Sequence, residues 1–393
     1  MEKYFKWFLG LGLIIRLVLA PVTYHSDLGA FAQAGRAIVG EGKWLSFYDT
    51  MLTPKVDTVF NYQPLAYLIP ATFYLPFKGT VLATGDLVKN RDWVWSTTSY
   101  FNPLLLLYKF PMLLADLAFL WLLPKFFTDQ RKKQLVMLFW AFNPVAIFVS
   151  SMMGQVDIII AFLITAGFYF YQQDRPFYSV ILISLSALIK PAGLILIPLL
   201  ALHHLTTHRK LIPAVSLAFT GFGVYALGIL PYLSSIAYRQ YALFAEQIGK
   251  STYAAISIAS GHDVPWFFIA YLLILILVWH RKLSFMTASA AALLSSLAFS
   301  HFHPQWLVWI LPWLTIFVIS KEDYFLYLVV IACWFIILFS FDPTLHLQLF
   351  VHSNLTLPQA LRGSPSFFEI VQLARAGLIA TLIWIIGGVH ETN

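Results

Sequence analysis

Four short polar segments interrupt an otherwise apolar chain: His25–Ser26–Asp27, Gly154–Gln155–Val156–Asp157, Lys190–Pro191 and His301–Phe302–His303–Pro304–Gln305–Trp306. A carboxylate such as that of Asp27 can act as a general base. Lysine and histidine side chains can stabilise negative charge that develops during a reaction. Because an ionisable residue at membrane depth is costly, it is a functional hypothesis by default. These segments are therefore the candidates for a functional site.

Each of these residues also has a plain structural interpretation. Asp27 and Asp157 can cap the helices that follow them, because aspartate is favoured at helix N-termini. Lys190 can extend its ammonium group to the membrane interface, and His301 and His303 can be ordinary interfacial hydrogen-bond donors. Metal binding by the two histidines would need further ligands, and no loop spacing indicates them. No cofactor is therefore predicted, and a divalent metal stays an open alternative.

The composition is that of a membrane protein. The 393-residue chain is 60% hydrophobic and 11% charged, whereas soluble domains carry about 25% charged residues. Apolar runs long enough to span ~30 Å of hydrocarbon recur along the chain. At these lengths only helices can satisfy all their backbone hydrogen-bonding groups within lipid. The sequence predicts an all-α, polytopic membrane protein that forms one integral-membrane domain over residues 1–393. About twelve transmembrane helices are expected at 5–22, 101–124, 133–150, 157–173, 176–190, 191–206, 211–231, 265–280, 283–300, 305–320, 324–341 and 367–388.

The basic residues set the orientation. With the N-terminus inside, the short inner loops and termini carry about half of the 25 Lys and Arg residues, which is typical of a cytoplasmic side. The long outer loops are then about 23–100, 232–264 and 342–366, and the four polar segments all reach the outer face. The basic residues form short clusters between apolar segments rather than one stripe, so no nucleic-acid partner is indicated.

The first outer loop is too long for a simple connector. Residues Leu28 to Val39 have helical spacing and Gly40–Glu41–Gly42 ends the pattern, which predicts a short surface helix. The apolar stretch from Pro64 to Phe77 is too short to span, so an interfacial or re-entrant helix is expected there. In the second span, Lys109 and Asp116 lie seven residues apart on one face, which predicts a buried structural pair that Arg16 can join.

Five elements occur in the same order as in a known family. Asp27 opens the long first outer loop, and four motifs follow it: Phe60–Asn61–Tyr62–Gln63–Pro64–Leu65, Asn143–Pro144 with Gly154–Gln155–Val156–Asp157, Ala187–Leu188–Ile189–Lys190–Pro191, and His301–Phe302–His303–Pro304–Gln305. This ordered set, over residues 1–320, resembles the GT-C glycosyltransferases that use polyprenyl-phosphate sugars, including the dolichyl-phosphate-dependent mannosyltransferases of N-glycan and GPI-anchor assembly. One departure is that Asp27 stands alone rather than in an acidic pair, which puts metal use in doubt.

The resemblance implies a glycosyltransferase that moves a hexose, with mannose expected, from a polyprenyl-phosphate carrier at the outer membrane face. The acceptor would be a glycan, a lipid-linked glycan or a protein, and the anomeric centre would invert. Asp27 would be the catalytic base. The resemblance also implies substrate-binding roles for Arg36, Tyr62, Gln155, Asp157, Lys190, His301, His303, Gln305 and Trp306.

A transporter or flippase for a lipid-linked sugar is the alternative, because many spans with intramembrane charges fit it as well. No two-half repeat is present and the first outer loop is elaborate, which favours the transferase. The expected partners are the donor lipid, the acceptor and membrane lipid. The expected location is the inner membrane of a prokaryote, with the site facing outward, or the endoplasmic reticulum membrane of a eukaryote.

Overall fold

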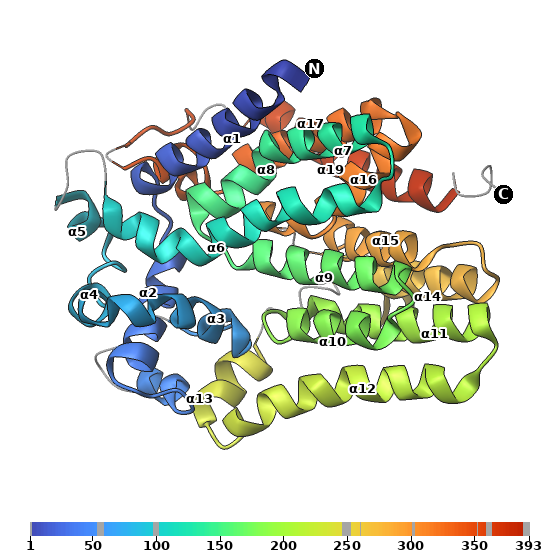
Figure 1. Cartoon of the computed structure of the whole chain (residues 1–393), viewed down its shortest axis with the longest axis horizontal. Coiled ribbons are helices and arrows are strands. Elements are labelled where there is room, and N and C mark those ends of the chain that lie inside the picture. The colour runs from blue at the N-terminus through green and yellow to red at the C-terminus, as the bar shows by residue number, and fades with distance from the viewer. Residues whose placement is uncertain are drawn as a thin grey trace.

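The computed structural model describes residues 2–52, 59–96, 102–245, 253–259, 261–300, 303–351, 353–358 and 364–387. Figure 1 shows a bundle of long helices with a group of short helices at one end. The bundle is formed by α1 (Glu2–Val22), α6 (Pro103–Leu122), α7 (Gln130–Ala141), α8 (Pro144–Ile147), α9 (Asp157–Gln172), α10 (Pro176–Ala187), α11 (Leu196–His208), α12 (Leu211–Ile229), α14 (Trp266–Trp279), α15 (Phe285–Ala298), α16 (Leu311–Lys321), α17 (Tyr324–Ser340) and α19 (Pro365–Gly387).

The outer-loop elements lie at the left end of the bundle in Figure 1. They are α2 (Asp27–Gly35), α3 (Leu65–Tyr74), α4 (Lys78–Thr84), α5 (Arg91–Ser96) and α13 (Ile236–Tyr238). Two antiparallel strands, β1 (Ala255–Ala259) and β2 (His262–Pro265), belong to the second outer loop. Short 3-10 and π segments complete the chain: η1 (Arg36–Gly40), η2 (Phe47–Leu52), η3 (Leu75–Phe77), η4 (Leu123–Phe126), η5 (Phe148–Met153), η6 (Pro191–Ile195), η7 (Leu230–Tyr232), η8 (Arg239–Leu243), η10 (Pro304–Trp309), η11 (Pro343–Leu345) and η12 (Leu347–Leu349).

Helical structure occurs in every range that the sequence predicts to cross the membrane. Within the described residues, five helices are long and apolar enough to cross alone, or six if the bent pair at 130–153 is one span. The number of about twelve crossings therefore stays a prediction. The all-α expectation is confirmed for most of the chain but misses the hairpin, whose turn contains Gly261 at φ +89°, a conformation open to glycine.

The helical path of the chain is interrupted at three X–Pro steps, and these interruptions carry the polar motifs. Asn143, Lys190 and His303 each precede a proline and are extended, with ψ of 113°, 142° and 139°. The proline ring disfavours helical geometry in the residue before it, so the helix must end there and restart. The restart is α8, η6 or η10. Polar groups are thereby placed inside the protein, at helix ends.

The first outer loop corrects two expectations. The predicted helix is present as α2, it continues through η1 and it ends at Gly40 as expected. It is not a surface helix, because all residues from Leu28 to Gly35 are buried, and it packs chiefly on α3. The apolar stretch from Pro64 to Phe77 forms α3 and η3. Together with α4 it makes the helical run Leu65–Thr84, which is long and apolar enough to cross a membrane, contrary to the expectation that the stretch is too short to span.

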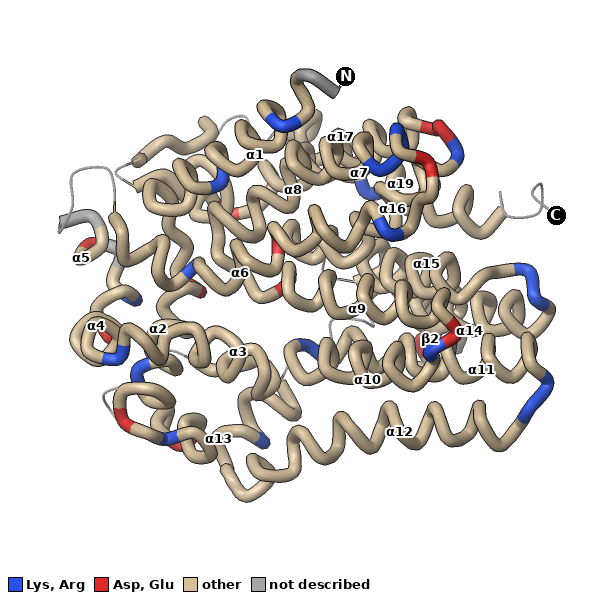
Figure 2. The backbone as a smooth tube through the Cα atoms, viewed as in Figure 1, with Lys and Arg blue, Asp and Glu red and all other residues tan. Residues whose placement is uncertain are grey.

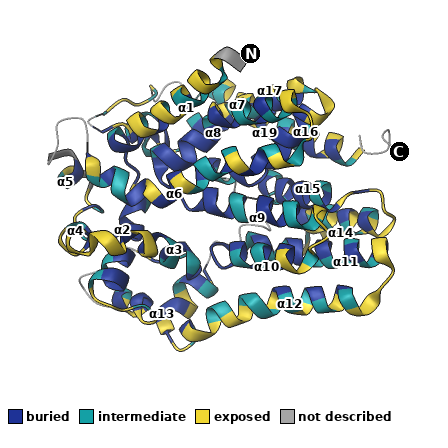
Figure 3. Ribbon diagram, viewed as in Figure 1, coloured by how far each residue is buried: buried dark blue, intermediate teal, exposed yellow. Residues whose placement is uncertain are grey.

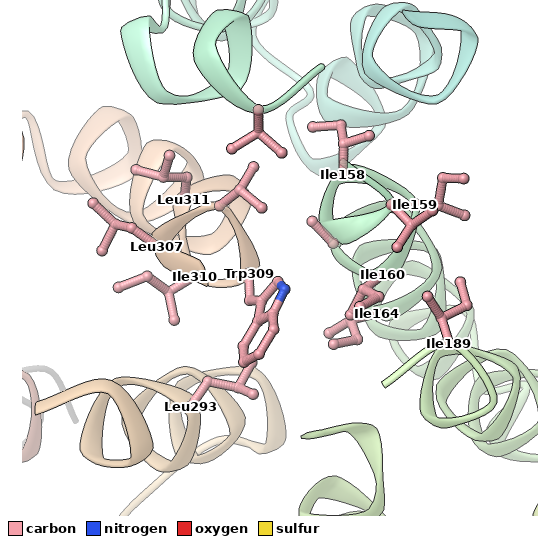
Figure 4. Close-up of a cluster of buried hydrophobic side chains, with 14 of the residues drawn as sticks. Ile158, Ile159, Ile160, Ile164, Ile189, Leu293, Leu307, Trp309, Ile310 and Leu311 are labelled. Atoms are coloured by element: carbon pink, nitrogen blue, oxygen red, sulfur yellow. The ribbon is translucent and has the colours of Figure 1, made fainter. Parts of the chain in front are cut away.

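The core lies where the long helices face one another, and the exposed residues lie on their outer sides (Figure 3). Part of it is a set of isoleucines on α9 opposite η10 (Figure 4). In that view Trp309 reaches from η10 toward α9. Apolar packing of this kind holds α9 and η10 in fixed register, so the polar residues at their ends are fixed too.

A buried ion pair joins α1 to α6, and it corrects the predicted Lys109–Asp116 pair. Arg16 Nε donates to Asp116 Oδ2 at 2.7 Å and Nη2 donates to Oδ1 at 3.2 Å. Trp140 Nε1 also donates to Asp116 Oδ1, at 2.8 Å. Lys109 binds elsewhere, because seven residues of helix separate two side chains by roughly 10 Å along the axis. Figure 2 shows most other charges at the two ends of the bundle.

We predict that Asp116→Asn lowers the free energy of unfolding by about 3–5 kcal/mol, because Arg16 would stay buried without a counter-charge. Unfolding in mixed detergent micelles would measure this loss. Glu41→Gln is the control, since the partly exposed pair of Glu41 with Lys43 contributes at most about 1 kcal/mol. Equal losses in the two variants would contradict the assignment of the Arg16–Asp116 pair as a structural clamp.

Candidate functional site

Asp27 lies where the chain leaves α1 and enters α2. The connecting residues are held by the last outer loop, because Tyr24 N donates to Leu349 O at 2.7 Å and Val351 N donates to Val22 O at 2.8 Å. Asp27 is the first residue of α2, and the N-cap position belongs to Ser26, without any side-chain capping bond. The structure therefore does not use the Asp27 carboxylate as a helix cap.

The Asp27 carboxylate is oriented by one strong donor. Gln155 Nε2 donates to Asp27 Oδ2 at 2.6 Å, and Gln155 is placed there by the turn at Gly154, which has φ +72°. His25 Nδ1 accepts the backbone N–H of Asp27 at 3.2 Å and lies 3.7 Å from Asp27 Oδ2. Asp27 Oδ1 has no partner among the described residues, and the side chain is 38% exposed. One oxygen is thus fixed and the other is open to receive a proton.

Lys190 forms a buried ion pair with Asp157. The Lys190 ammonium lies 2.7 Å from Asp157 Oδ2, and Trp309 Nε1 donates to Oδ1 at 3.0 Å. Asp157 is fully buried, and it does not cap α9 through its side chain. Both oxygens of Asp157 are therefore occupied, so its role in this geometry is to hold Lys190. Lys190 does not extend to solvent, since it is also buried.

Tyr62 contacts Lys190 and lies within electrostatic range of Asp27 and Asp157. The Lys190 ammonium is 4.3 Å from the centre of its ring. Burial raises the pKa of Tyr62, and the charges of Asp27 and then Asp157 raise it further, so its hydroxyl stays protonated at physiological pH. Tyr62 thus links Asp27 and Lys190 into one cluster.

The backbone around Tyr62 is fixed on both sides. Tyr48 Oη donates to the Tyr62 carbonyl at 2.6 Å, and Tyr62 N donates to Tyr67 Oη at 3.2 Å. The next residues of this motif bond to the end of α10, since the N–H groups of Gln63 and Leu65 donate to Ile189 O and Leu188 O at 3.2 and 2.9 Å. The loop motif is therefore attached to the same helix end that presents Lys190.

The late motif approaches the cluster through its tryptophans. Trp306 stacks on Trp309 with ring centres 5.4 Å apart and an interplanar angle of 15°, and the His303 ring lies 5.1 Å from Trp306. His301 lies outside the described residues. Within the described chain, three buried polar atoms of this region have no hydrogen-bond partner: Gln155 Oε1, Gln305 Oε1 and Trp306 Nε1. These are two acceptors and one donor available to a ligand.

Arg36 belongs to a separate charge cluster. Its guanidinium bonds to Asp86, and Nη1 lies 3.6 Å from Glu41 Oε1. Among the described residues, Arg36 makes no hydrogen bond or ion pair with Asp27 or Lys190. A role of Arg36 in phosphate binding stays a prediction, and it would require this acidic cluster to release the side chain.

Trp309 belongs to this cluster but is not among the site residues predicted from the sequence. It lies one helical turn after Trp306, and this spacing was the signal that could have identified it. As for metals, the described residues include no group of three or more His, Cys, Asp or Glu side chains that could hold one. The chemistry available to the cluster is proton transfer, hydrogen bonding and stabilisation of negative charge.

Comparison with known proteins assigns the fold and the family. Over its whole length the chain is similar in structure to ArnT from Cupriavidus metallidurans bound to undecaprenyl phosphate, with a TM-score of 0.52, 14% sequence identity and 76% of ArnT covered. At this level of identity the similarity defines the fold, which is a helical membrane-protein fold shared with ArnT. The chain belongs to glycosyltransferase family 87, whose model matches residues 93–302. No curated sequence matches the chain significantly.

The matched residues include part of the cluster only. Gln155, Asp157 and Lys190 lie within the family match, whereas Asp27, Tyr62 and Gln305 lie outside it. The resemblance to GT-C enzymes that the motifs indicate is confirmed. The roles of the individual residues stay predictions.

We predict that Lys190→Met lowers the free energy of unfolding by about 3–5 kcal/mol, because the Asp157 carboxylate would lose its buried counter-ion. Adding Asp157→Asn to this variant should restore part of the loss, since the uncompensated charge is then removed. Unfolding of wild type, both single variants and the double variant in mixed micelles gives the coupling energy. Losses that simply add would contradict the pairing.

Proposed function

We propose that this protein transfers a neutral hexose, mannose in the first instance, from a polyprenyl phosphate to an acceptor hydroxyl, with Asp27 as general base. The observation that carries the proposal is the state of the Asp27 carboxylate, with one oxygen held by Gln155 and the other open. The family assignment supports sugar transfer. The undecaprenyl phosphate bound to ArnT supports a polyprenyl-phosphate carrier.

In the proposed reaction the acceptor oxygen bonds to the anomeric carbon while the bond from that carbon to the phosphate oxygen breaks. Asp27 takes the hydroxyl proton, and the polyprenyl phosphate leaves with the electron pair. This single displacement inverts the anomeric centre. Asp27 is the acidic residue of the cluster that combines partial burial with an unoccupied oxygen, so this oxygen can receive the proton.

Lys190 is the proposed cation for the leaving phosphate. Its ammonium already bonds to Asp157 and faces the Tyr62 ring, which leaves hydrogen-bonding capacity for a phosphate oxygen. Preorganised donors of this kind stabilise negative charge without reorganising during the reaction. His303, with its ring near Trp306, is proposed as a further donor. His301 is proposed for the same role from the resemblance alone.

The free polar atoms favour a neutral sugar. Gln155 Oε1 and Gln305 Oε1 can accept hydrogen bonds from sugar hydroxyls, and Trp306 Nε1 can donate one. An uronic acid would bring a carboxylate toward two acceptor oxygens, and such a contact leaves all three groups unsatisfied. Mannose and glucose both fit these donors and acceptors, and the resemblance to GPI and N-glycan mannosyltransferases favours mannose. The acceptor is proposed to approach from the outer loops, at the outward face of the membrane.

A flippase is the second candidate, because buried charges also mark transport sites. The family assignment favours the enzyme. The charges also favour it, since Asp27 and Asp157 are the first residues of α2 and α9 and Lys190 precedes η6, so that all three lie at helix ends rather than midway along a helix.

We predict that Asp27→Asn slows transfer from synthetic polyprenyl-phosphate mannose by about 10²–10⁴-fold, the usual contribution of a general base. The melting temperature should not change, because Asp27 is partly exposed and does not cap α2. Asp92→Asn, at an exposed carboxylate of the same loop, is the control and should keep full activity. Full transfer by Asp27→Asn would exclude Asp27 as the base.

We also predict that the purified protein discriminates among polyprenyl-phosphate sugars. Mannose or glucose should be transferred at least ten times faster than galacturonic acid, because one unpaired buried polar group costs about 1–3 kcal/mol. Radiolabel retained in the acceptor gives the rates, and NMR of the product gives its anomeric configuration. Preference for the charged sugar, or a product with retained configuration, would contradict the proposed site.

A further inference from the structure

Lys109 is a fully buried lysine of α6 whose partners are all uncharged. Its ammonium donates to Thr23 O at 2.6 Å, Met152 O at 2.8 Å and Ala20 O at 2.9 Å, and it lies 3.1 Å from Thr23 Oγ1. A buried ammonium without a carboxylate is unusual. Its location therefore needs a reason beyond ion pairing.

The oxygens around Lys109 come from the ends of two helices. Ala20 and Thr23 are at the end of α1, and Met152 is in the last turn of η5. The last carbonyls of a helix lack intrahelical partners, and the helix dipole makes this end attractive to a cation. Lys109 thus donates hydrogen bonds to carbonyl oxygens at two helix ends and thereby connects these ends to each other.

The chain leaves these two ends directly toward the proposed site. Asp27 follows four residues after Thr23, and Gln155 follows three residues after Met152. The turn between Met152 and Gln155 rests on the lysine itself, because a Cβ at Gly154 would lie 2.7 Å from Lys109 Cγ. Gly154 also has φ +72°. The Lys109 side chain therefore limits the direction in which the chain can run from the end of η5 to Gln155.

We propose that Lys109 is a positioning residue that holds the end of α1 and the end of η5 together, so that Gln155 Nε2 keeps its 2.6 Å contact with the Asp27 carboxylate. This inference rests on the proposed function of Asp27. Lys109 does not touch the reacting atoms and acts through Gln155 and Asp27.

The test is a kinetic comparison of Lys109→Met with wild type, using polyprenyl-phosphate mannose and the purified full chain. We expect kcat to fall at least tenfold, because the base is misplaced. KM should rise as well, because the displaced Gln155 Oε1 is also a proposed contact for a sugar hydroxyl. Lys109→Arg should recover part of kcat, since it keeps the charge and several donors. If the methionine variant does not fold, Lys109→Gln, which keeps one donor group for these carbonyls, is judged by the same criteria.

A double-variant cycle separates positioning from a general loss of stability. Gln155→Ala removes the contact that Lys109 is proposed to maintain, so the Lys109→Met/Gln155→Ala double variant should be no slower than the slower single variant. Asp116→Asn is the matched control, with a buried polar group of the same helix that contacts neither Asp27 nor Gln155. It should lower the melting temperature and keep kcat within threefold of wild type.

An unchanged kcat in Lys109→Met would overturn the inference, and so would losses that multiply in the double variant. A fall in kcat for Asp116→Asn as large as that for Lys109→Met would also overturn it, because destabilisation alone would then explain both. Asp27→Asn, measured beside these variants, judges the premise separately. If that variant kept full activity, the proposed function would fail and this inference with it, whatever the Lys109 variants did.

Discussion

Inside a bilayer, water cannot satisfy the backbone groups that a broken helix sets free, and this constraint organises the outer end of the protein. The chain breaks its helices before Pro144, Pro191 and Pro304 and turns at Gly154. Buried side chains satisfy the freed groups. The Asn143 side chain accepts the first N–H groups of α8, and Lys109 binds the last carbonyls of α1 and η5. The breaks are therefore rigid, and the polar residues that they carry are held in fixed positions.

The same constraint divides the acidic residues into two kinds. Asp116 and Asp157 are fully buried, and each has both oxygens bonded to buried partners. Asp27 is partly exposed and has one oxygen bonded. Asp27 therefore keeps one oxygen that can receive a proton, whereas both oxygens of Asp116 and Asp157 are occupied. Burial and bonding, rather than residue type, thus distinguish the candidate base from the structural aspartates.

Several residues of the cluster were foreseen from motifs, but their contacts were not. The motif order indicated that Asp27, Tyr62, Gln155, Asp157 and Lys190 belong together, and the structure brings these five into one cluster. The pairing of Asp157 with Lys190 and Trp309 had no local signal, because these residues are 33 and 152 positions from Asp157. The helical spacing of Lys109 and Asp116 was read as a pair, yet each binds partners on other helices. The last outer loop also holds the residues that precede Asp27, although it lies outside residues 1–320, over which the family motifs occur.

The sequence alone determined the membrane environment, the helical class, the positions of the breaks and the glycosyltransferase resemblance. These follow from composition and from local rules, because lipid admits helices and proline ends them within a residue or two. Only the tertiary structure decided which charges neutralise one another, that α2 is buried, and which Asp27 oxygen stays open. Such facts depend on which helix faces come into contact, and contact between distant segments produces no periodic pattern in a single sequence.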